Sequence, residues 1–298
     1  MPDENTSNNS FTTQTNIIPL YYWTGHNNFG DELSPYIVSK LSGKNIIYAP
    51  KFSNNKLVAT GSLIHRDLLT SKSIIWGTGC MSPVILNLRP FPLNRLIKTL
   101  YKQLMHGYNS TICAVRGPLT RNLLLKHGIP CPKIYGDPAI ILPLIYTPKQ
   151  TIETNQSSIG LILHHSQEKL LLQKNQIENS GIRIISVFRS GSDNIEKFID
   201  EVTSCKYIFS SSLHGIIVAQ TYGIDCQWIT FQNNPIHEYQ YFKFIDYFQG
   251  SNQTIQRPLI IRSSRPSDIS VILKKEPTRT IKLTNREKLI DAFPQNIF

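Results

Sequence analysis

The sequence has few acidic residues, and one long interval contains none. Its 298 residues include 20 Asp and Glu against 31 Lys and Arg, which leaves a net charge of +11. Between Asp67 and Asp137 there are nine basic residues and no acidic one. We therefore expect a negatively charged partner, with nucleic acid, anionic lipid and phosphorylated metabolites as candidate classes. The alternative is that the positive charge serves solubility alone.

Paired cysteines, a membrane-spanning run and a metal-ligand motif are also missing. The five cysteines are scattered without a Cys-x-x-Cys pair, so we expect small buried thiols, no disulfide framework and a cytoplasmic location. The longest apolar stretch, around 138–146, is about half of what a bilayer crossing needs. The first sixteen residues carry no Lys or Arg, unlike a secretory signal. Without a His-Glu-x-x-His motif or a carboxylate cluster, we predict no catalytic metal and no cofactor.

Short apolar runs alternate with amphipathic stretches, which is typical of parallel, doubly wound sheets. Strands are predicted at 16–22, 56–59, 73–76, 112–115, 133–135, 159–163, 181–187, 207–210 and 226–229. Helices are predicted at 31–41, 118–127, 168–178, 194–204, 215–222 and 285–292. The chain therefore predicts an α/β fold with two Rossmann-like domains that face a cleft. We expect a disordered tail (1–15), a first domain (16–146), a linker (147–157), a second domain (158–250) and a partly helical extension (251–298).

One further helix is expected from Leu93 to Met105, inside the acid-free interval. Its apolar residues recur at helical spacing, and Arg95, Lys98 and Lys102 share another face. A basic amphipathic helix of this kind can lie on an anionic membrane surface. An ordinary solvated helix that packs on its domain is the alternative.

Two glycine-containing segments follow predicted strands of the first domain. The first contains Asn28, Gly30 and Asp31, where glycine admits a ligand close to the backbone and the polar side chains offer hydrogen bonds. A plain turn with Asp31 as the helix N-cap is equally compatible with this pattern. The second segment contains Gly77 and Gly79 and by itself favours a turn.

Arg116 directly precedes Gly117 and Pro118, at the start of a predicted helix. A guanidinium next to free backbone N–H groups can bind an anion. The alternative is an arginine that pairs with a buried carboxylate, and Asp137, which follows the next predicted strand, is the candidate partner.

A cluster of hydroxyls and an imidazole follows a strand of the second domain. Ser211, Ser212 and His214 precede the predicted helix, which suits phosphate or carboxylate binding and proton transfer. Helix-capping serines with a structural histidine are the alternative. His164 and His165 end another strand, but neighbouring residues of a strand point to opposite sides, so they are not expected to share a metal.

Together these segments resemble the polysaccharide pyruvyl transferase family between about Tyr21 and Trp228. The matching motifs are NFGDEL from Asn28, WGTG from Trp76, VRGPLT from Val115, GDPA from Gly136 and SSLHG from Ser211. The segment from Gly160 to His164 is similar to the Gly-x-x-Pro-His strand of the family, with leucine in place of proline. Each motif is loose alone, whereas the ordered set is specific.

The resemblance implies a GT-B-like fold and transfer of the enolpyruvyl unit of phosphoenolpyruvate onto a sugar of a surface glycan or its lipid-linked precursor. The product would be a cyclic pyruvate ketal, commonly across O4 and O6 of a hexose. The resemblance implies that the first domain binds the acceptor sugar. The residues expected to contact it are Asn28, Gly30, Asp31, Gly77 and Gly79. The second domain takes phosphoenolpyruvate.

The resemblance also suggests roles for individual side chains. Donor contacts would come from Arg116, Ser211, Ser212, His214 and His164. His214 is the expected general acid or phosphate clamp, and Asp31 or Asp137 the expected base. Many members carry arginine where this chain has Ser212, and Arg189 is our candidate replacement.

Two other functions remain open at this point. One is a GT-B glycosyltransferase that uses a nucleotide sugar, because the fold is shared. The other is a non-enzymatic protein that binds polyanions or membranes through its basic face. The absence of basic repeats interleaved with aromatic residues argues against nucleic acid as a partner. A lipid pyrophosphate acceptor at the inner membrane surface fits the surplus positive charge better.

Overall fold

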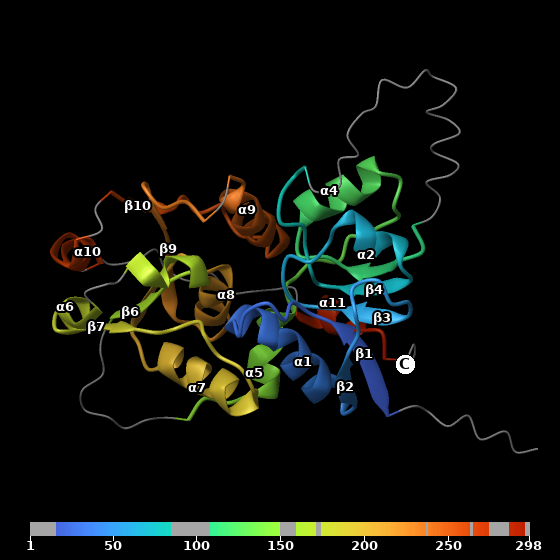
Figure 1. Cartoon of the computed structure of the whole chain (residues 1–298), viewed down its shortest axis with the longest axis horizontal. Coiled ribbons are helices and arrows are strands. Elements are labelled where there is room, and N and C mark those ends of the chain that lie inside the picture. Colours follow the sequence, from blue (N-terminus) through green and yellow to red (C-terminus); the bar gives the residue numbers. More distant parts are fainter. Residues whose placement is uncertain are drawn as a thin grey trace, which may run out of the picture.

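Two parallel β-sheets form the framework of the part of the chain that the structure, a computed structural model, describes (Figure 1). This part comprises residues 16–84, 108–149, 159–170, 174–236, 238–262, 265–273 and 286–295. Within it the sheets have five strands each, in the orders β2-β1-β3-β4-β5 and β10-β9-β8-β6-β7. The predicted α/β class is confirmed, and the arrangement is consistent with two Rossmann-like domains. The basic helix expected from Leu93 to Met105 lies outside the described residues.

The first sheet is assembled from the amino-terminal half of the chain. Its strands are β1 (Ile17–Tyr21), β2 (Asn45–Tyr48), β3 (Lys56–Val58), β4 (Ser73–Trp76) and β5 (Thr111–Ala114). The helices of this half are α1 (Phe29–Ser42), α2 (Arg66–Thr70) and α4 (Pro118–Lys126). α1 begins where the Asn28 side chain accepts a hydrogen bond from the backbone N–H of Gly30, and it ends at Gly43, whose φ of 69° places it in the left-handed region.

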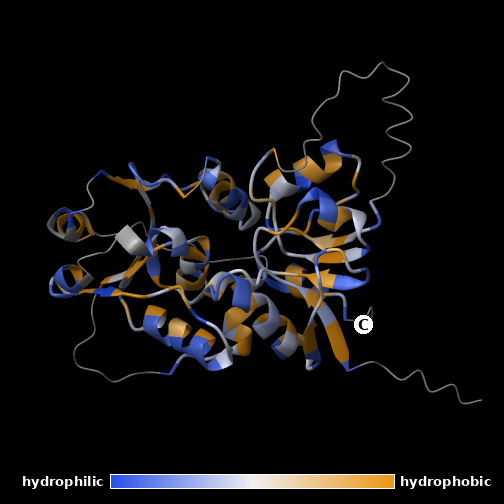
Figure 2. Ribbon diagram, in the orientation of Figure 1, coloured by the Kyte–Doolittle hydropathy of each residue, from blue (hydrophilic) through white to orange (hydrophobic). Residues whose placement is uncertain are grey.

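The second sheet follows η1 (Pro138–Ile141) and α5 (Leu142–Ile145) in the chain. Its strands are β6 (Ile159–Ile162), β7 (Ile182–Ile184), β8 (Tyr207–Ser210), β9 (Asp225–Phe231) and β10 (Leu259–Ile261). The helical segments are η2 (His165–Leu170), α6 (Lys174–Glu178), α7 (Ser192–Thr203), α8 (Leu213–Thr221), α9 (Gln240–Gly250), α10 (Pro266–Leu273) and α11 (Arg286–Asp291). Apart from the exposed edge strand β2, the sheets are largely apolar and packed against helices, as expected for parallel strands (Figure 2).

Two helices from the carboxyl-terminal part of the chain, α9 and α11, pack on the amino-terminal half. α9 lies beside α4, and α11 lies against the first sheet (Figure 1). The Trp76 indole N–H, at the end of β4, donates to the carbonyl of Leu289 in α11 at 2.8 Å. Phe293 packs edge-on against the same indole, with 4.9 Å between ring centroids. Segments distant in the sequence therefore complete the core of the amino-terminal half.

Most predicted strands and helices are present, and the differences have local causes. The strand predicted at 133–135 is wrong, because only one bridge forms there, between Tyr135 and Val115, and Pro130 and Pro132 cannot donate ladder hydrogen bonds. The single helix predicted at 168–178 is described as η2 and α6. The elements that were not predicted are β2, β10, α2, η1, α5, α9 and α10. No helix of the described residues is both long and apolar enough to cross a membrane.

Candidate active site

The N-termini of α1 and α8 meet at Gly30 and His214. The imidazole of His214, the second residue of α8, lies so close that a Cβ atom on Gly30 would overlap the ring. α1 follows the carboxyl end of β1, and α8 follows that of β8. The contact therefore joins the two sheets at the strand ends where α/β proteins bind ligands.

A buried carboxylate contacts the imidazole of His214. Asp137 Oδ2 lies 3.6 Å from His214 Nε2, and the aspartate has no exposed surface. Its other oxygen accepts the backbone N–H of Ala139 at 3.1 Å, at the start of η1. Neither Asp137 Oδ2 nor His214 Nε2 has a hydrogen-bond partner among the described residues, so the two interact as a longer ionic contact. The His214 side chain is 15% exposed, so the ring reaches the surface beside the buried carboxylate.

Asp31 is the second carboxylate of this group. Its Oδ2 accepts a hydrogen bond from Asn28 Nδ2 at 3.1 Å. Burial raises the pKa of Asp31, and the charge of His214 and the hydrogen bond from Asn28 offset part of this effect. The alternative prediction, Asp31 as N-cap of α1, is wrong, because Asn28 has that position. One carboxylate therefore contacts the imidazole directly, and the charge of a second interacts with it.

Arg116 is inside the protein and binds protein groups. Its Nε lies 3.2 Å from Asp246 Oδ2 in α9, and its other nitrogens donate to the Gly61 and Cys80 carbonyls and to Ser62 Oγ. Neither side chain of the Arg116–Asp246 pair has exposed surface. Arg116 pairs with Asp246 and not with Asp137, so the partner expected for it is corrected. The guanidinium has no exposed surface on which a substrate anion could bind. This agrees with the alternative interpretation, an arginine that pairs with a buried carboxylate.

Gly77 and Gly79 are buried, next to the turn that carries Asp137 and next to Arg116. Gly77, with φ of 86°, lies against Pro138 and the Gly136 carbonyl, and so supports the turn that carries Asp137. Gly79 packs on the guanidinium of Arg116. In this structure both glycines allow close backbone packing, and they do not themselves contact His214.

The serines predicted for the donor side lie at the end of β8. Ser211 is buried, and its Oγ accepts the backbone N–H of His164 at 3.0 Å. Ser212 is the N-cap of α8, but its side chain makes no capping hydrogen bond. The first turn of α8, which contains His214, therefore has backbone N–H groups without a side-chain cap.

Arg189 does not join the His214 group. Its Nη2 lies 2.6 Å from Glu201 Oε2 in α7, and its Nε donates to the Ser186 carbonyl at 3.2 Å. The Arg189 backbone N–H donates to the Asn27 carbonyl at 2.9 Å, which links the loops of the two halves. Its charge is therefore neutralised by Glu201.

The family model for polysaccharide pyruvyl transferase matches residues 25–233, a segment that contains all of these side chains except those of α9. The chain belongs to the polysaccharide pyruvyl transferase family. No curated protein matches this chain. A crystal structure of a functionally uncharacterised protein from Klebsiella pneumoniae is similar at 13% identity, with a TM-score of 0.46, and the match covers 83% of this chain and 94% of that one.

Lys243 in α9 was not predicted as a site residue of this polysaccharide pyruvyl transferase family member. This lysine is only 8% exposed. Burial and the charge of Arg116 lower its pKa to about 8, and the carboxylate of Asp31 acts in the opposite direction. The only sequence signal was a lysine three residues before Asp246 in an aromatic-rich segment, where no helix had been predicted.

Three histidines lie next to one another beyond the carboxyl end of β6 in the second sheet. The rings of His164 and His165 are 4.1 Å apart, and that of His26, from the loop before α1, is 5.3 Å from His165. Burial lowers the pKa of His165, and the positive charges of His26 and Lys243 lower it further. In the described part of the chain, no three His, Cys, Asp or Glu residues are arranged to hold a metal ion.

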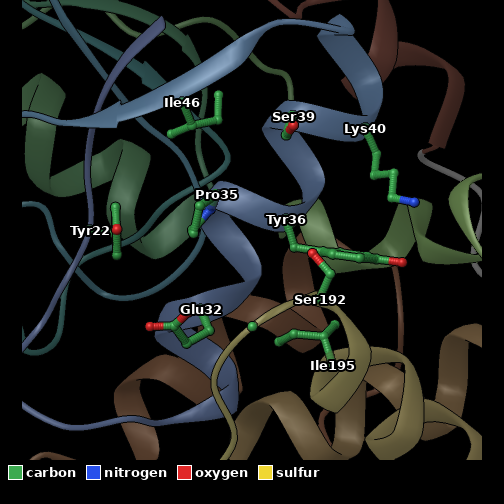
Figure 3. Close-up of a pocket in the computed structure, with 10 residues that line it drawn as sticks. Tyr22, Glu32, Pro35, Tyr36, Ser39, Lys40, Ile46, Ser192 and Ile195 are labelled. Carbon is green, nitrogen blue, oxygen red and sulfur yellow. The ribbon is translucent and has the colours of Figure 1, made fainter.

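A pocket of about 340 Å³ lies on the outer face of α1 (Figure 3). Its walls include Tyr22, Glu32, Tyr36 and Lys40 from the first half and Ser192 from α7. Asp31 and Gly30 are on other faces of the same helix, so the pocket is separate from the His214 group. It provides surface residues for control substitutions.

Proposed function

We propose that this chain transfers the enolpyruvyl unit of phosphoenolpyruvate onto a hexose of a surface polysaccharide or its lipid-linked precursor. The products are a cyclic pyruvate ketal, bridging O4 and O6 of the hexose, and inorganic phosphate. Family membership supports the pyruvyl transfer. The 3.6 Å contact between His214 and the buried Asp137 is the observation that carries the chemistry. The two-sheet architecture is compatible with a GT-B-like fold.

The first step needs a proton donor at the methylene carbon of phosphoenolpyruvate. His214, whose ring contacts the Asp137 carboxylate, adds a proton to this carbon, which becomes a methyl group. The neighbouring carbon, which bears the carboxylate and the phosphate ester, then acquires oxocarbenium character. Asp137 acts through His214 and is a positioning residue, because it lies buried below the ring.

The second step adds the sugar. One hexose hydroxyl attacks the oxocarbenium carbon and gives its proton to Asp31, whose raised pKa suits a general base better than that of an exposed carboxylate. The C–O bond to phosphate breaks, and phosphate leaves with the bonding electron pair. The second hydroxyl then attacks the same carbon and loses its proton, which closes the ketal ring. The protons balance over the reaction. The two sugar hydroxyls release two protons: one replaces the proton that the protein added to the methylene carbon, and the other leaves on the phosphate.

The assay is incubation with phosphoenolpyruvate and a panel of β-linked hexosides and N-acetylhexosaminides. We expect phosphate release together with an acceptor mass gain of one pyruvate less one water. His214→Asn should abolish both signals in a folded protein. Thermal stabilisation by nucleotide sugars but not by phosphoenolpyruvate would favour the glycosyltransferase alternative. Retention of ketal formation by His214→Asn would contradict the assigned acid.

A lipid-linked acceptor would place the reaction at the cytoplasmic face of a membrane. The basic helix expected from Leu93 to Met105 supplies the positive charge for this contact. Sedimentation with liposomes that contain anionic lipid should recover the protein, and neutral liposomes should not. Equal recovery with both would contradict membrane contact through charge.

A further inference from the structure

Lys243 has unusual surroundings for a lysine. It is 8% exposed, and its amine makes no hydrogen bond or ion pair with a described residue, while Asp31 acts on it through charge alone. The nearest described contact is the ring of Phe244, whose centroid is 5.8 Å from Nζ. A largely buried cation that no carboxylate contacts directly is costly, so such groups are normally paired or neutralised. The position is therefore suited to an anion that arrives from outside the protein.

The backbone that carries Lys243 is fixed on both sides. Phe244 stacks on Trp228 of the second sheet, with ring centroids 4.3 Å apart, and Asp246 binds the buried Arg116 of the first half. α9 therefore bridges the two halves of the molecule with Lys243 between the two anchors. A lysine held in this way is preorganised and loses little freedom when a ligand binds.

Lys243 interacts electrostatically with one of two neighbouring histidines. His165 and His26 lie side by side, and the charge of Lys243 acts on His165. The Nδ1 atom of His165 is buried without a hydrogen-bond partner among the described residues. Asp31 is the one acidic group whose charge acts on Lys243, and it also interacts with His214. The charge of Asp31 therefore acts on both Lys243 and His214, the second residue of α8.

We infer that Lys243, assisted by His165, binds the phosphate group of phosphoenolpyruvate. This inference rests on the proposed function and identifies the cation that Ser212 does not supply. The two arginines considered from the sequence are already neutralised, Arg189 by Glu201 and Arg116 by Asp246. A compact ammonium can follow the phosphate as its bond to carbon breaks, and it neutralises the charge that develops on the leaving oxygen.

The test is calorimetric titration of the full-length protein with phosphoenolpyruvate, inorganic phosphate and pyruvate, in the absence of acceptor. Lys243→Met keeps the aliphatic stem and removes the charge, and Lys243→Arg restores a cation. We expect Lys243→Met to weaken binding of phosphoenolpyruvate and phosphate by about 10- to 100-fold, the range for one charge-assisted contact. Pyruvate binding should change less than twofold, and Lys243→Arg should recover part of the loss. Lys40→Met, in the outer pocket, is the matched lysine control and should bind like the wild type.

Unchanged phosphoenolpyruvate affinity in folded Lys243→Met would overturn the inference. Farnesyl diphosphate serves as a further probe, and if Lys243→Met weakens its binding but not that of phosphoenolpyruvate, the lysine serves a diphosphate acceptor and the inference is wrong. If Lys243→Met does not fold, His165→Asn must weaken phosphate binding for the inference to stand. Ketal formation with unchanged KM in Lys243→Met would sink the inference but keep the proposed function. If phosphoenolpyruvate binding depends on Lys243 but no ketal forms with any acceptor, the inference stands and the proposed function is contradicted.

Discussion

His214 Nε2 lies 3.6 Å from Asp137 Oδ2, and this contact joins the two halves of the chain across the candidate site. The histidine belongs to the second half and starts α8, whereas the aspartate follows the first sheet. Because the carboxylate has no exposed surface, its charge acts on the imidazole with little screening by water. The acid and its positioning group are therefore correctly placed only when both halves are docked.

Replacement of Asp137 should slow catalysis more than it weakens binding. Asp137→Asn keeps the acceptor for the Ala139 N–H but removes the negative charge that contacts the His214 ring. We expect kcat to fall about 100-fold, within the usual range for general acid–base catalysis, while the KM for phosphoenolpyruvate changes less than threefold. Steady-state phosphate release over a range of pH measures both constants. Asp67→Asn, at an exposed carboxylate, is the control, and a wild-type kcat in Asp137→Asn would show that the contact is only structural.

Asp31→Asn should inactivate the protein and stabilise it at the same time. Because burial raises the pKa of Asp31 in the folded state, the ionised carboxylate costs stability above that pKa, and asparagine removes the cost. The Tm of Asp31→Asn should exceed that of the wild type at pH 7 to 8. The difference should shrink as the pH falls and the wild-type carboxyl becomes protonated. Thermal unfolding at several pH values tests this, and a lower Tm at pH 7 would contradict the assigned environment.

Gly30→Ala should separate stability from activity. The added methyl group overlaps the imidazole of His214, so the ring must move, and overpacking of this kind costs about 1–3 kcal/mol. Gly128→Ala is the matched control: its φ of 76° makes alanine unfavourable by about 1–2 kcal/mol, but nothing lies near the new methyl group. Both variants should lose stability, and only Gly30→Ala should lose at least tenfold in kcat. Equal activity of the two would show that the position of the ring is unimportant.

The buried pair of Arg116 and Asp246 should be costly to break from one side. Arg116→Met leaves an unpaired buried carboxylate, and Asp246→Leu leaves an unpaired buried guanidinium, each for a loss of about 3–5 kcal/mol. The double variant should be less destabilised than the sum of the single ones, although Thr120 still loses its two hydrogen bonds to Asp246. Denaturant unfolding of all four proteins measures the coupling. Strict additivity would mean that the pair contributes no specific interaction.

The sequence predicted elements with clear periodicity and missed those determined by tertiary contacts. β4 and β8 were placed at their observed bounds because each is a short apolar run between polar or glycine residues. β2 escaped notice because its NIIY segment is a largely exposed edge strand without alternation. α9 was missed because its aromatic residues face two different surroundings, the second sheet on one side and α4 on the other.

Within the candidate site, the sequence identified groups at strand ends but not their partners. Motif spacing placed Asp31, Asp137 and His214 correctly at the ends of elements, and the structure brings them together. Motif spacing did not show whether Arg116 binds a ligand or is buried in an ion pair. Its partner, Asp246, lies 130 residues later in the sequence and outside every motif. Lys243 belongs to no motif, and only its burial beside Asp31 reveals it.

The contact of Trp76 with α11 has a consequence for synthesis of the chain on the ribosome. The indole N–H of Trp76 bonds to Leu289, and its ring packs against Phe293, both near the carboxyl end. The amino-terminal half emerges first but reaches its complete core only after the last helix has been translated. Nascent chains halted before residue 286 should therefore leave this tryptophan without its cover, and chaperones should bind them for longer than they bind the finished protein.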